Sequence, residues 1–336
     1  MKTKNNLRKI LAILLACAMT LAFAACGASP AAGDKPADDG TIKIAIIKQL
    51  DHASLDEIAN AVAERLTEMN EAGEAKIEFS ISSGQNDQTI LKQLCDQAIA
   101  DKVDVIIPIA TTAAQVAALS AEGTGVKVVY AAVSDPEAAK LTGIDYVSGT
   151  CDALNTEFII NMMLAQNPDV KKVGLLYSLS EPNSATPIAD AKTVLEANGI
   201  EYVEQTANTN DEVVAAASAL IAAGVDAVFT PTDNVIMAAE LAIYENLAKA
   251  GIPHYTGADS FVRNGAFATC GVNYTELGRK SAELAMKAVA GEALEDYYLM
   301  DGGIITVNTE TAAMLGADYS AFAAMGEIVE VTTSKD

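Results

Sequence analysis

Short apolar runs alternate with amphipathic segments along most of the chain, beginning near residue 41. The runs are rich in β-branched residues and predict strands, while the segments between them show the apolar spacing of helices. The first series predicts strands at residues 42–48, 76–82, 104–109 and 127–132 and helices at residues 55–70, 87–100 and 112–122. Strands that alternate with helices indicate right-handed βαβ units and a parallel sheet.

The alternation starts again after about Gly149. The second series predicts strands at residues 172–178, 201–205, 226–230 and 267–272 and helices at residues 152–166, 184–198, 211–223, 235–250 and 276–289, before a strand-rich tail. One large sheet is the alternative. Two restarted series favour two α/β lobes, for which a chain of 336 residues is long enough.

Two stretches, residues 103–112 and 225–234, share one pattern. Each has Val-Asp, then an apolar strand, then a proline with small polar residues, and a helical pattern follows each stretch. In a parallel α/β sheet such strand ends lie at the carboxyl edge, where ligands bind near helix N-termini. One such edge in each half of the chain predicts two lobes that face each other across a cleft.

The first 25 residues do not show the alternation of predicted strands and helices and have a composition of their own. Residues 1–9 are basic and residues 10–22 are apolar, which is the pattern of a cleavable export signal. Small residues precede Cys26, as in a bacterial lipobox, so we expect Cys26 to be lipidated and to anchor the protein at the outer face of the cell membrane. An ordinary signal peptide with a chance cysteine is the alternative. Residues 26–40 lack a hydrophobic period and predict a flexible tether.

The net charge narrows the choice of partners. It is −23 for the whole chain, and removal of residues 1–25, which carry four basic and no acidic residues, makes it −27. A protein domain with this negative net charge repels nucleic acid and anionic lipid. We therefore expect no nucleic-acid partner and membrane contact through the lipid anchor only.

Residues with catalytic or metal chemistry are sparse. The histidines are His52 and His254, and no metal-binding spacing, nucleophile elbow, phosphate loop or dinucleotide fingerprint is present. Beyond Cys26 the cysteines are Cys95, Cys151 and Cys270, whose number and spacing favour buried thiols, although one pair could form a bridge. The sequence predicts a protein that is not an enzyme and that needs no metal or cofactor.

Candidate ligand contacts are the polar residues at the predicted carboxyl edges. The first rank comprises Thr111, Thr112, Ser134, Asp135, Glu181, Asn183, Ser184, Asp233, Asn234 and Asp259, and the second rank comprises Gln49, Asn86 and Ser260. Hydroxyls and helix N–H groups suit a carboxylate, and acidic side chains suit an ammonium, so the set fits a zwitterion. The alternative for each residue is that it only caps a helix.

Aromatic residues near the same edges could line a pocket for an apolar or aromatic side chain. They are Tyr130, Tyr177, Phe229, Tyr255, Phe261 and Tyr274. Most of them are expected to be core residues, and the sequence leaves open which ones face a ligand.

Taken together, five motifs in order resemble a known family. They lie at residues 51–56, 104–115, 132–136, 177–184 and 231–234. This combination is similar to the tryptophan/tyrosine-type substrate-binding lipoproteins of ABC transporters, over residues 42–291. The resemblance implies the type I periplasmic-binding fold, an α/β fold with two doubly wound parallel-sheet lobes and a hinged interlobe cleft. The lobes are then expected at residues 41–149 plus 261–293 and at residues 150–260 plus 294–336.

The resemblance also implies a function. Family members bind amino acids in the cleft, so Thr111, Thr112 and Ser134 would meet the carboxylate, and Asp233, supported by Asp135 or Glu181, would meet the ammonium. The protein would be a monomer that delivers a free amino acid, aromatic or large and apolar, to an ABC permease and its ATPase. The alternative is a ligand-sensing module of the same fold for another solute, such as a nucleoside or a sugar.

Overall fold

The computed structural model describes residues 40–334, and one compact unit begins at Thr41. The predicted signal peptide, the tether before Gly40 and the lipidation site Cys26 lie outside the described residues. Within residues 40–334 no helix is both long and apolar enough to cross a membrane.

The first sheet has six parallel strands in the order β11-β5-β4-β3-β1-β2. Its strands are β1 (Thr41–Lys48), β2 (Lys76–Ser83), β3 (Val105–Ile109), β4 (Lys127–Tyr130), β5 (Val147–Cys151) and β11 (Tyr298–Leu299). The strands β1, β2, β3 and β4 agree with the four strands predicted for the first series, whereas β5 is not among the predicted strands. We call this sheet and its helices lobe 1.

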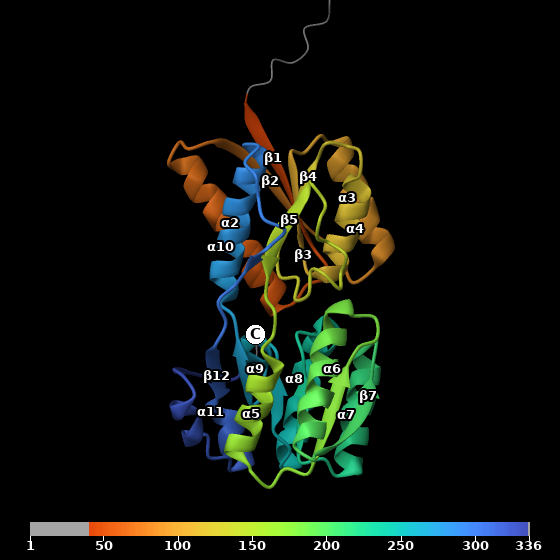
Figure 1. Cartoon of the computed structure of the whole chain (residues 1–336), viewed down its shortest axis with the longest axis vertical. Helices are drawn as coiled ribbons and strands as arrows, with labels where there is room; N and C mark the ends of the chain where they lie inside the picture. The colour runs from red at the N-terminus through yellow and green to blue at the C-terminus, as the bar shows by residue number, and fades with distance from the viewer. Residues whose placement is uncertain (1–39, 335–336) are drawn as a thin grey trace, which may run out of the picture. The chain divides into compact units, whose positions relative to one another are not determined.

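Four helices cover the two faces of the first sheet, with α2 and α10 on one face and α3 and α4 on the other (Figure 1). They span α2 (Ala53–Glu71), α3 (Gln88–Ala100), α4 (Thr111–Ala121) and α10 (Tyr274–Val289). Gly278 allows α10 to approach α2 closely, because a Cβ there would lie 2.6 Å from the Ile58 carbonyl oxygen.

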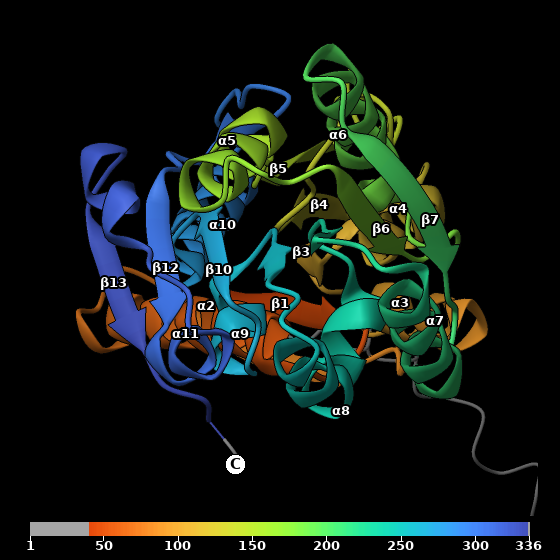
Figure 2. The ribbon, with the colours of Figure 1, turned by 90° about the horizontal axis from the view of Figure 1, so that it is seen from below.

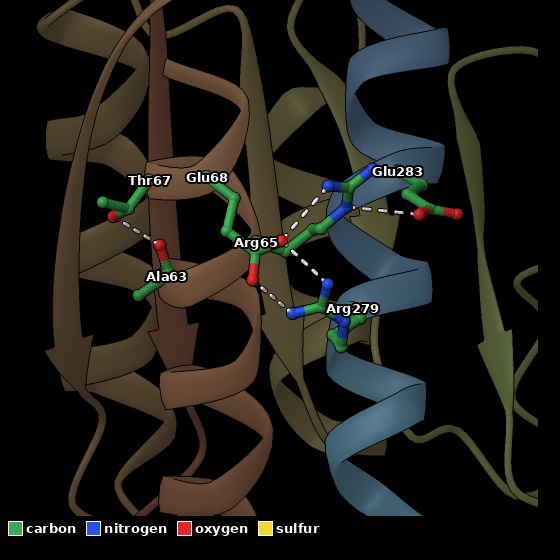
Figure 3. Close-up of polar contacts among 6 residues, drawn as sticks. All are labelled: Ala63, Arg65, Thr67, Glu68, Arg279 and Glu283. Carbon is green, nitrogen blue, oxygen red and sulfur yellow. Dashed lines mark hydrogen bonds and ion pairs between the residues drawn. The ribbon is translucent and has the colours of Figure 1, made fainter. Parts of the chain in front are cut away.

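Ion pairs join the exposed faces of the same two helices (Figure 3). Arg279 of α10 donates two hydrogen bonds to the Glu68 carboxylate of α2, at 2.9 and 2.8 Å, and Arg65 of α2 reaches Glu283 of α10 at 3.2 Å. Segments more than 200 residues apart in the chain thus form one face of lobe 1.

The second sheet has seven strands in the order β13-β12-β10-β9-β8-β6-β7. Its strands are β6 (Lys172–Tyr177), β7 (Glu201–Thr206), β8 (Ala227–Thr230), β9 (His254–Thr256), β10 (Ala268–Gly271), β12 (Ile304–Asn308) and β13 (Ile328–Val331). The pairing is parallel except between β10 and β12, because the chain returns from lobe 1 before β12 and enters the sheet in the opposite direction. We call this sheet and its helices lobe 2.

Helices also cover both faces of the second sheet (Figure 2). One face carries α5 (Thr156–Gln166) and α6 (Ala185–Ala197), and the other carries α7 (Asn210–Ala223), α8 (Asn234–Lys249), α9 (Asp259–Arg263) and α11 (Thr309–Leu315). Two short 3₁₀ turns, η1 (Pro182–Ser184) and η2 (Ser320–Ala324), complete the lobe.

The chain crosses between the sheets three times, at residues 152–155, 272–273 and 300–303. Each crossing lies later in the chain than the sequence predicts, since the predicted lobe boundaries put the crossings near residues 149, 260 and 294. β10 pairs with β9 and β12, so residues 261–271 belong with lobe 2 and not with lobe 1, and β11 pairs with β5, so residues 294–299 belong with lobe 1. Apolar periodicity identifies a strand but does not say which sheet it joins.

Candidate functional site

A small cavity lies between the lobes, at the carboxyl ends of their strands. Its apolar wall is formed by Leu55, Ile58, Met237 and Phe261, and its polar wall includes Ser134, Asp152, Asn183, Thr232, Asp233 and Asn234. The free volume is about 20 Å³, which is room for about one water molecule. An amino acid can therefore enter only when the surrounding side chains or the lobes move apart.

Asp152 is a buried acid that lines this cavity and has no cationic partner among the described residues. The side chain is 4% exposed, and its oxygens accept hydrogen bonds from Ser134 Oγ at 2.9 Å and from Tyr274 Oη at 3.1 Å. Both donors are neutral, and no ion pair to Asp152 is formed within residues 40–334. Burial consequently raises the pKa of Asp152.

Asp233 has a different environment. It is fully buried at the N-cap of α8, and its Oδ1 accepts hydrogen bonds from the backbone N–H groups of Val235 and Ile236. Its Oδ2 accepts from Ser178 N and Ser184 Oγ, both at 2.7 Å. Burial raises the pKa of Asp233, while these four donors oppose that rise. Asp233 lines the cavity, but its oxygens already serve a helix cap and the β6–α6 loop.

Glu181 connects the two lobes. Gln49 of lobe 1 donates from Nε2 to Glu181 Oε1 at 2.6 Å, and Asn234 of lobe 2 donates from Nδ2 to Glu181 Oε2 at 2.6 Å. The Asn234 Oδ1 lies 2.9 Å from His52 Nε2, so His52 must carry its proton on Nε2 to donate to this oxygen. Burial lowers the pKa of His52, which favours the neutral ring.

Several buried polar atoms around the cleft have no hydrogen-bond partner in the described residues. They are Thr111 Oγ1, Thr112 Oγ1, Gln49 Oε1, His52 Nδ1 and Asn183 Oδ1. Unpaired buried polar atoms are rare and costly in folded proteins. Of these residues, His52 and Asn183 line the cavity, where an unpaired polar atom suits a polar ligand, whereas Thr111, Thr112 and Gln49 lie outside the lining.

The backbone around the cavity is also unusual. Ala110 and Ala132 both line it, at the ends of β3 and β4, and have φ values of 80° and 56°. Residues other than glycine rarely adopt positive φ, and such strain is concentrated at functional sites. Ala110 is the N-cap of α4, so Thr111 and Thr112 form the first turn of this helix.

The remaining predicted residues fall into two groups. Near the cleft, Asn86 accepts from Gln49 at 3.1 Å, Asp135 accepts from Thr186 of lobe 2 at 2.7 Å, Ser184 supports Asp233, and Ser260 bonds Ser54 of lobe 1. Asp259 forms an ion pair with Arg263, four residues further along the same helix, at 3.0 Å. Of all the predicted polar residues, only Ser134, Asn183, Asp233 and Asn234 line the cavity itself.

Some cavity residues were missed or left undecided by the sequence. The sequence pattern predicts a helix from residue 152, whereas Asp152 directly follows β5 and α5 begins only at Thr156. Among the candidate aromatics only Phe261 and Tyr274 line the cavity. Cys95, Cys151 and Cys270 are free and buried, as most simply predicted. No cluster of metal-ligating side chains occurs in the part of the chain that is described.

The fold and the cavity define a class of protein: a two-lobed binding protein with the type I periplasmic-binding fold. The model of the ABC transporter substrate binding protein family matches residues 43–321. The chain therefore belongs to this family, whose members are substrate-binding components of transporters, and the resemblance found in the sequence is confirmed.

Three relatives of this chain are also described as binding proteins or have been solved with a bound ligand. The chain is 28% identical to a tyrosine-binding protein of Clostridioides difficile, over 94% of this chain and 93% of the relative. An ABC domain from Streptococcus pneumonia in complex with L-Trp is 24% identical with a TM-score of 0.77, over 86% and 100% of the two chains. The ligand-free, open structure of a Clostridium difficile substrate binding protein with adhesive properties is 27% identical, with a TM-score of 0.65 over 87% and 100%.

Proposed function

We propose that this protein binds a free α-amino acid between its lobes outside the cytoplasm and delivers it to the permease of an ABC importer. The observation that carries the proposal is Asp152, a buried carboxyl group beside the interlobe cavity with only neutral hydrogen-bond donors. A ligand ammonium would supply the positive charge that the protein itself does not provide. Buried charges are generally paired, so such a ligand offsets the cost of burying Asp152.

The carboxylate of the ligand has a matching set of donors. Thr111 and Thr112 form the first turn of α4, where backbone N–H groups are free, and both hydroxyls are buried without a partner. A helix N-terminus with hydroxyl groups binds an anion without needing an arginine. We assign the carboxylate to this turn, as the sequence predicted, and the ammonium to Asp152 in place of Asp233.

The apolar wall favours a large or aromatic ligand side chain. Leu55 and Ile58 come from α2 of lobe 1, and Met237 and Phe261 come from lobe 2, so both lobes contribute to it. The tyrosine-binding relative and the relative in complex with L-Trp support this choice. The three crossovers between the lobes would act as a hinge, and closure around the ligand would produce the surface that the permease recognises.

A thermal-shift panel tests the proposal. Purified protein would be heated with each common amino acid and with representative nucleosides and sugars, and hits would be measured by isothermal titration calorimetry. We expect tyrosine, tryptophan or another large apolar amino acid to raise the Tm. A rise with a sugar or nucleoside and with no amino acid would support the ligand-sensing alternative instead.

The cellular arrangement is part of the same proposal. Export and lipidation at Cys26 would place a monomer at the outer face of the membrane, connected by residues 26–40. Its acidic body would stay clear of anionic lipid.

A further inference from the structure

We infer that Glu181 is a positioning residue that joins the two lobes when it carries a proton, so that closure around the ligand takes up a proton. This inference rests on the proposed function, because it describes how the same cleft closes. Glu181 does not line the cavity and is not assigned to the ligand here.

Glu181 has two connections to lobe 1. One is direct, from Gln49 Nε2 at 2.6 Å, and the other runs through Asn234 to His52. Glu181 is 3% exposed and Gln49 is 1% exposed, so the contact excludes water. Because Gln49 belongs to lobe 1, separation of the lobes breaks this contact and returns the Glu181 carboxyl to water.

The neighbouring charges decide which carboxyl group holds the proton. Burial, together with the nearby Asp233, raises the pKa of Glu181 to about 8. Asp233 accepts four hydrogen bonds, three of them from backbone N–H groups, and these favour its charged form. We therefore assign the proton to Glu181 and the negative charge to Asp233.

Other titratable groups on the facing elements do not neutralise Glu181. On lobe 1, His52 is buried with a lowered pKa and hydrogen-bonds Asn234 instead. Lys48, at the end of β1, forms ion pairs with Asp51 and Asp56. A negative charge on Glu181 would thus have no compensating cation in the closed arrangement, which favours its protonated form.

The side-chain oxygen of Gln49 can also accept a hydrogen bond from a protonated Glu181. Its Oε1 is buried and has no partner in the described residues. A half-turn of the amide exchanges its oxygen and nitrogen, a choice that hydrogen-bond partners determine. A protonated Glu181 can then donate to this oxygen, at the cost of the hydrogen bond from Gln49 Nε2 to Asn86 Oδ1.

The direction of the pH effect follows from linkage. With the lobes apart and Glu181 in water, its pKa returns toward the ordinary value of 4.5, whereas in the closed arrangement it is about 8. Between these values closure must bind a proton. The contribution of Glu181 to affinity is then greatest at and below about pH 4.5, falls by up to ~tenfold per pH unit as the pH rises, and levels off above about pH 8.

The test uses calorimetric titration of L-tryptophan and L-tyrosine at pH 5 to 9, with Glu181→Gln as the informative variant. Glutamine resembles the protonated glutamate, so we expect the variant to bind more tightly than wild type at pH 8 and to show a flatter pH profile. Glu201→Gln is the matched control, since Glu201 is exposed at the amino end of β7. Titrations at pH 6.5 in two buffers of different ionisation enthalpy should show an uptake of about one proton for wild type and for Glu201→Gln.

Two results would overturn the inference: an unchanged pH profile in Glu181→Gln, or equal proton uptake by that variant and wild type. If neither amino acid binds at any pH, the proposed function fails. The inference is then tested by small-angle scattering of the ligand-free protein at pH 5 and pH 8.5. A smaller radius of gyration at pH 5 in wild type, reduced or lost in Glu181→Gln, supports it, and equal radii contradict it.

Discussion

The Oη of Tyr274 donates a hydrogen bond to Asp152 Oδ2 at 3.1 Å, across 122 residues of sequence. Asp152 begins the first crossover between the lobes, and Tyr274 begins α10 just after the second. The carboxyl group beside the cavity is therefore held by the connections about which the lobes would move. The proposed binding of a ligand ammonium there would link ligand contact directly to the crossovers.

Replacing Asp152 by Asn should weaken amino-acid binding strongly. The change removes the negative charge assigned to the ligand ammonium, and truncating one partner of a buried charge pair costs about 2–5 kcal/mol. Stability without ligand should be unchanged or slightly higher, since a buried acid is removed. Calorimetry and a urea melt would measure the two effects, with the exposed Asp169→Asn as control. An unaltered Kd would remove Asp152 from the binding site.

Replacing Asp233 by Asn should mainly lower stability. The amide cannot accept all four hydrogen bonds, so a donor such as Ser178 N loses its partner, at a cost of about 1–3 kcal/mol. The free energy of unfolding would be compared with that of Asp211→Asn, an exposed first-turn position of α7. If Asp233→Asn instead abolishes binding with full stability, the original assignment of Asp233 to the ammonium is correct.

The double variant Thr111→Val with Thr112→Val should lose affinity and keep its stability. Both hydroxyls are buried without a partner, so their removal costs the ligand-free protein little, while the ligand carboxylate loses two donors. We expect L-tryptophan to bind roughly tenfold or more weakly. Thr67→Val, on the exposed face of α2, is the control. Because L-tryptophanamide lacks the carboxylate, its affinity should depend much less on the two threonines; equal losses would argue against this assignment.

Replacing Cys26 by Ser should release the protein from the membrane without changing its affinity. Lipid attachment requires the thiol, whereas the cavity lies within residues 40–334. Fractionation of expressing cells would locate the protein, and calorimetry would measure binding. Continued association of the variant with membranes would contradict the predicted lipidation.

The sequence was sufficient for the two series of βα units because burial imposes local periodicity. Strands such as β1 and β8 contain short apolar runs, and polar residues that a binding edge needs follow their carboxyl ends. The sequence does not predict β5 and β9, since Val-Ser-Gly-Thr-Cys and His-Tyr-Thr contain no apolar run. The seven-stranded sheet also contains the antiparallel pair β10–β12, which no local pattern reveals.

The sequence alone thus determined which polar residues lie at strand ends, because local patterns show where a strand ends and the next helix begins. These strand ends also indicate the general position of the cleft. The tertiary structure decided which of these residues meet. It placed Asp152 beside the cavity, occupied Asp233 with a helix cap, paired Asp259 with Arg263 and set Glu181 against Gln49. The contacts of Glu181 and Asp152 join residues 132 and 122 positions apart and are fixed by the packing of the lobes, whereas the helix cap at Asp233 and the Asp259–Arg263 pair are local contacts.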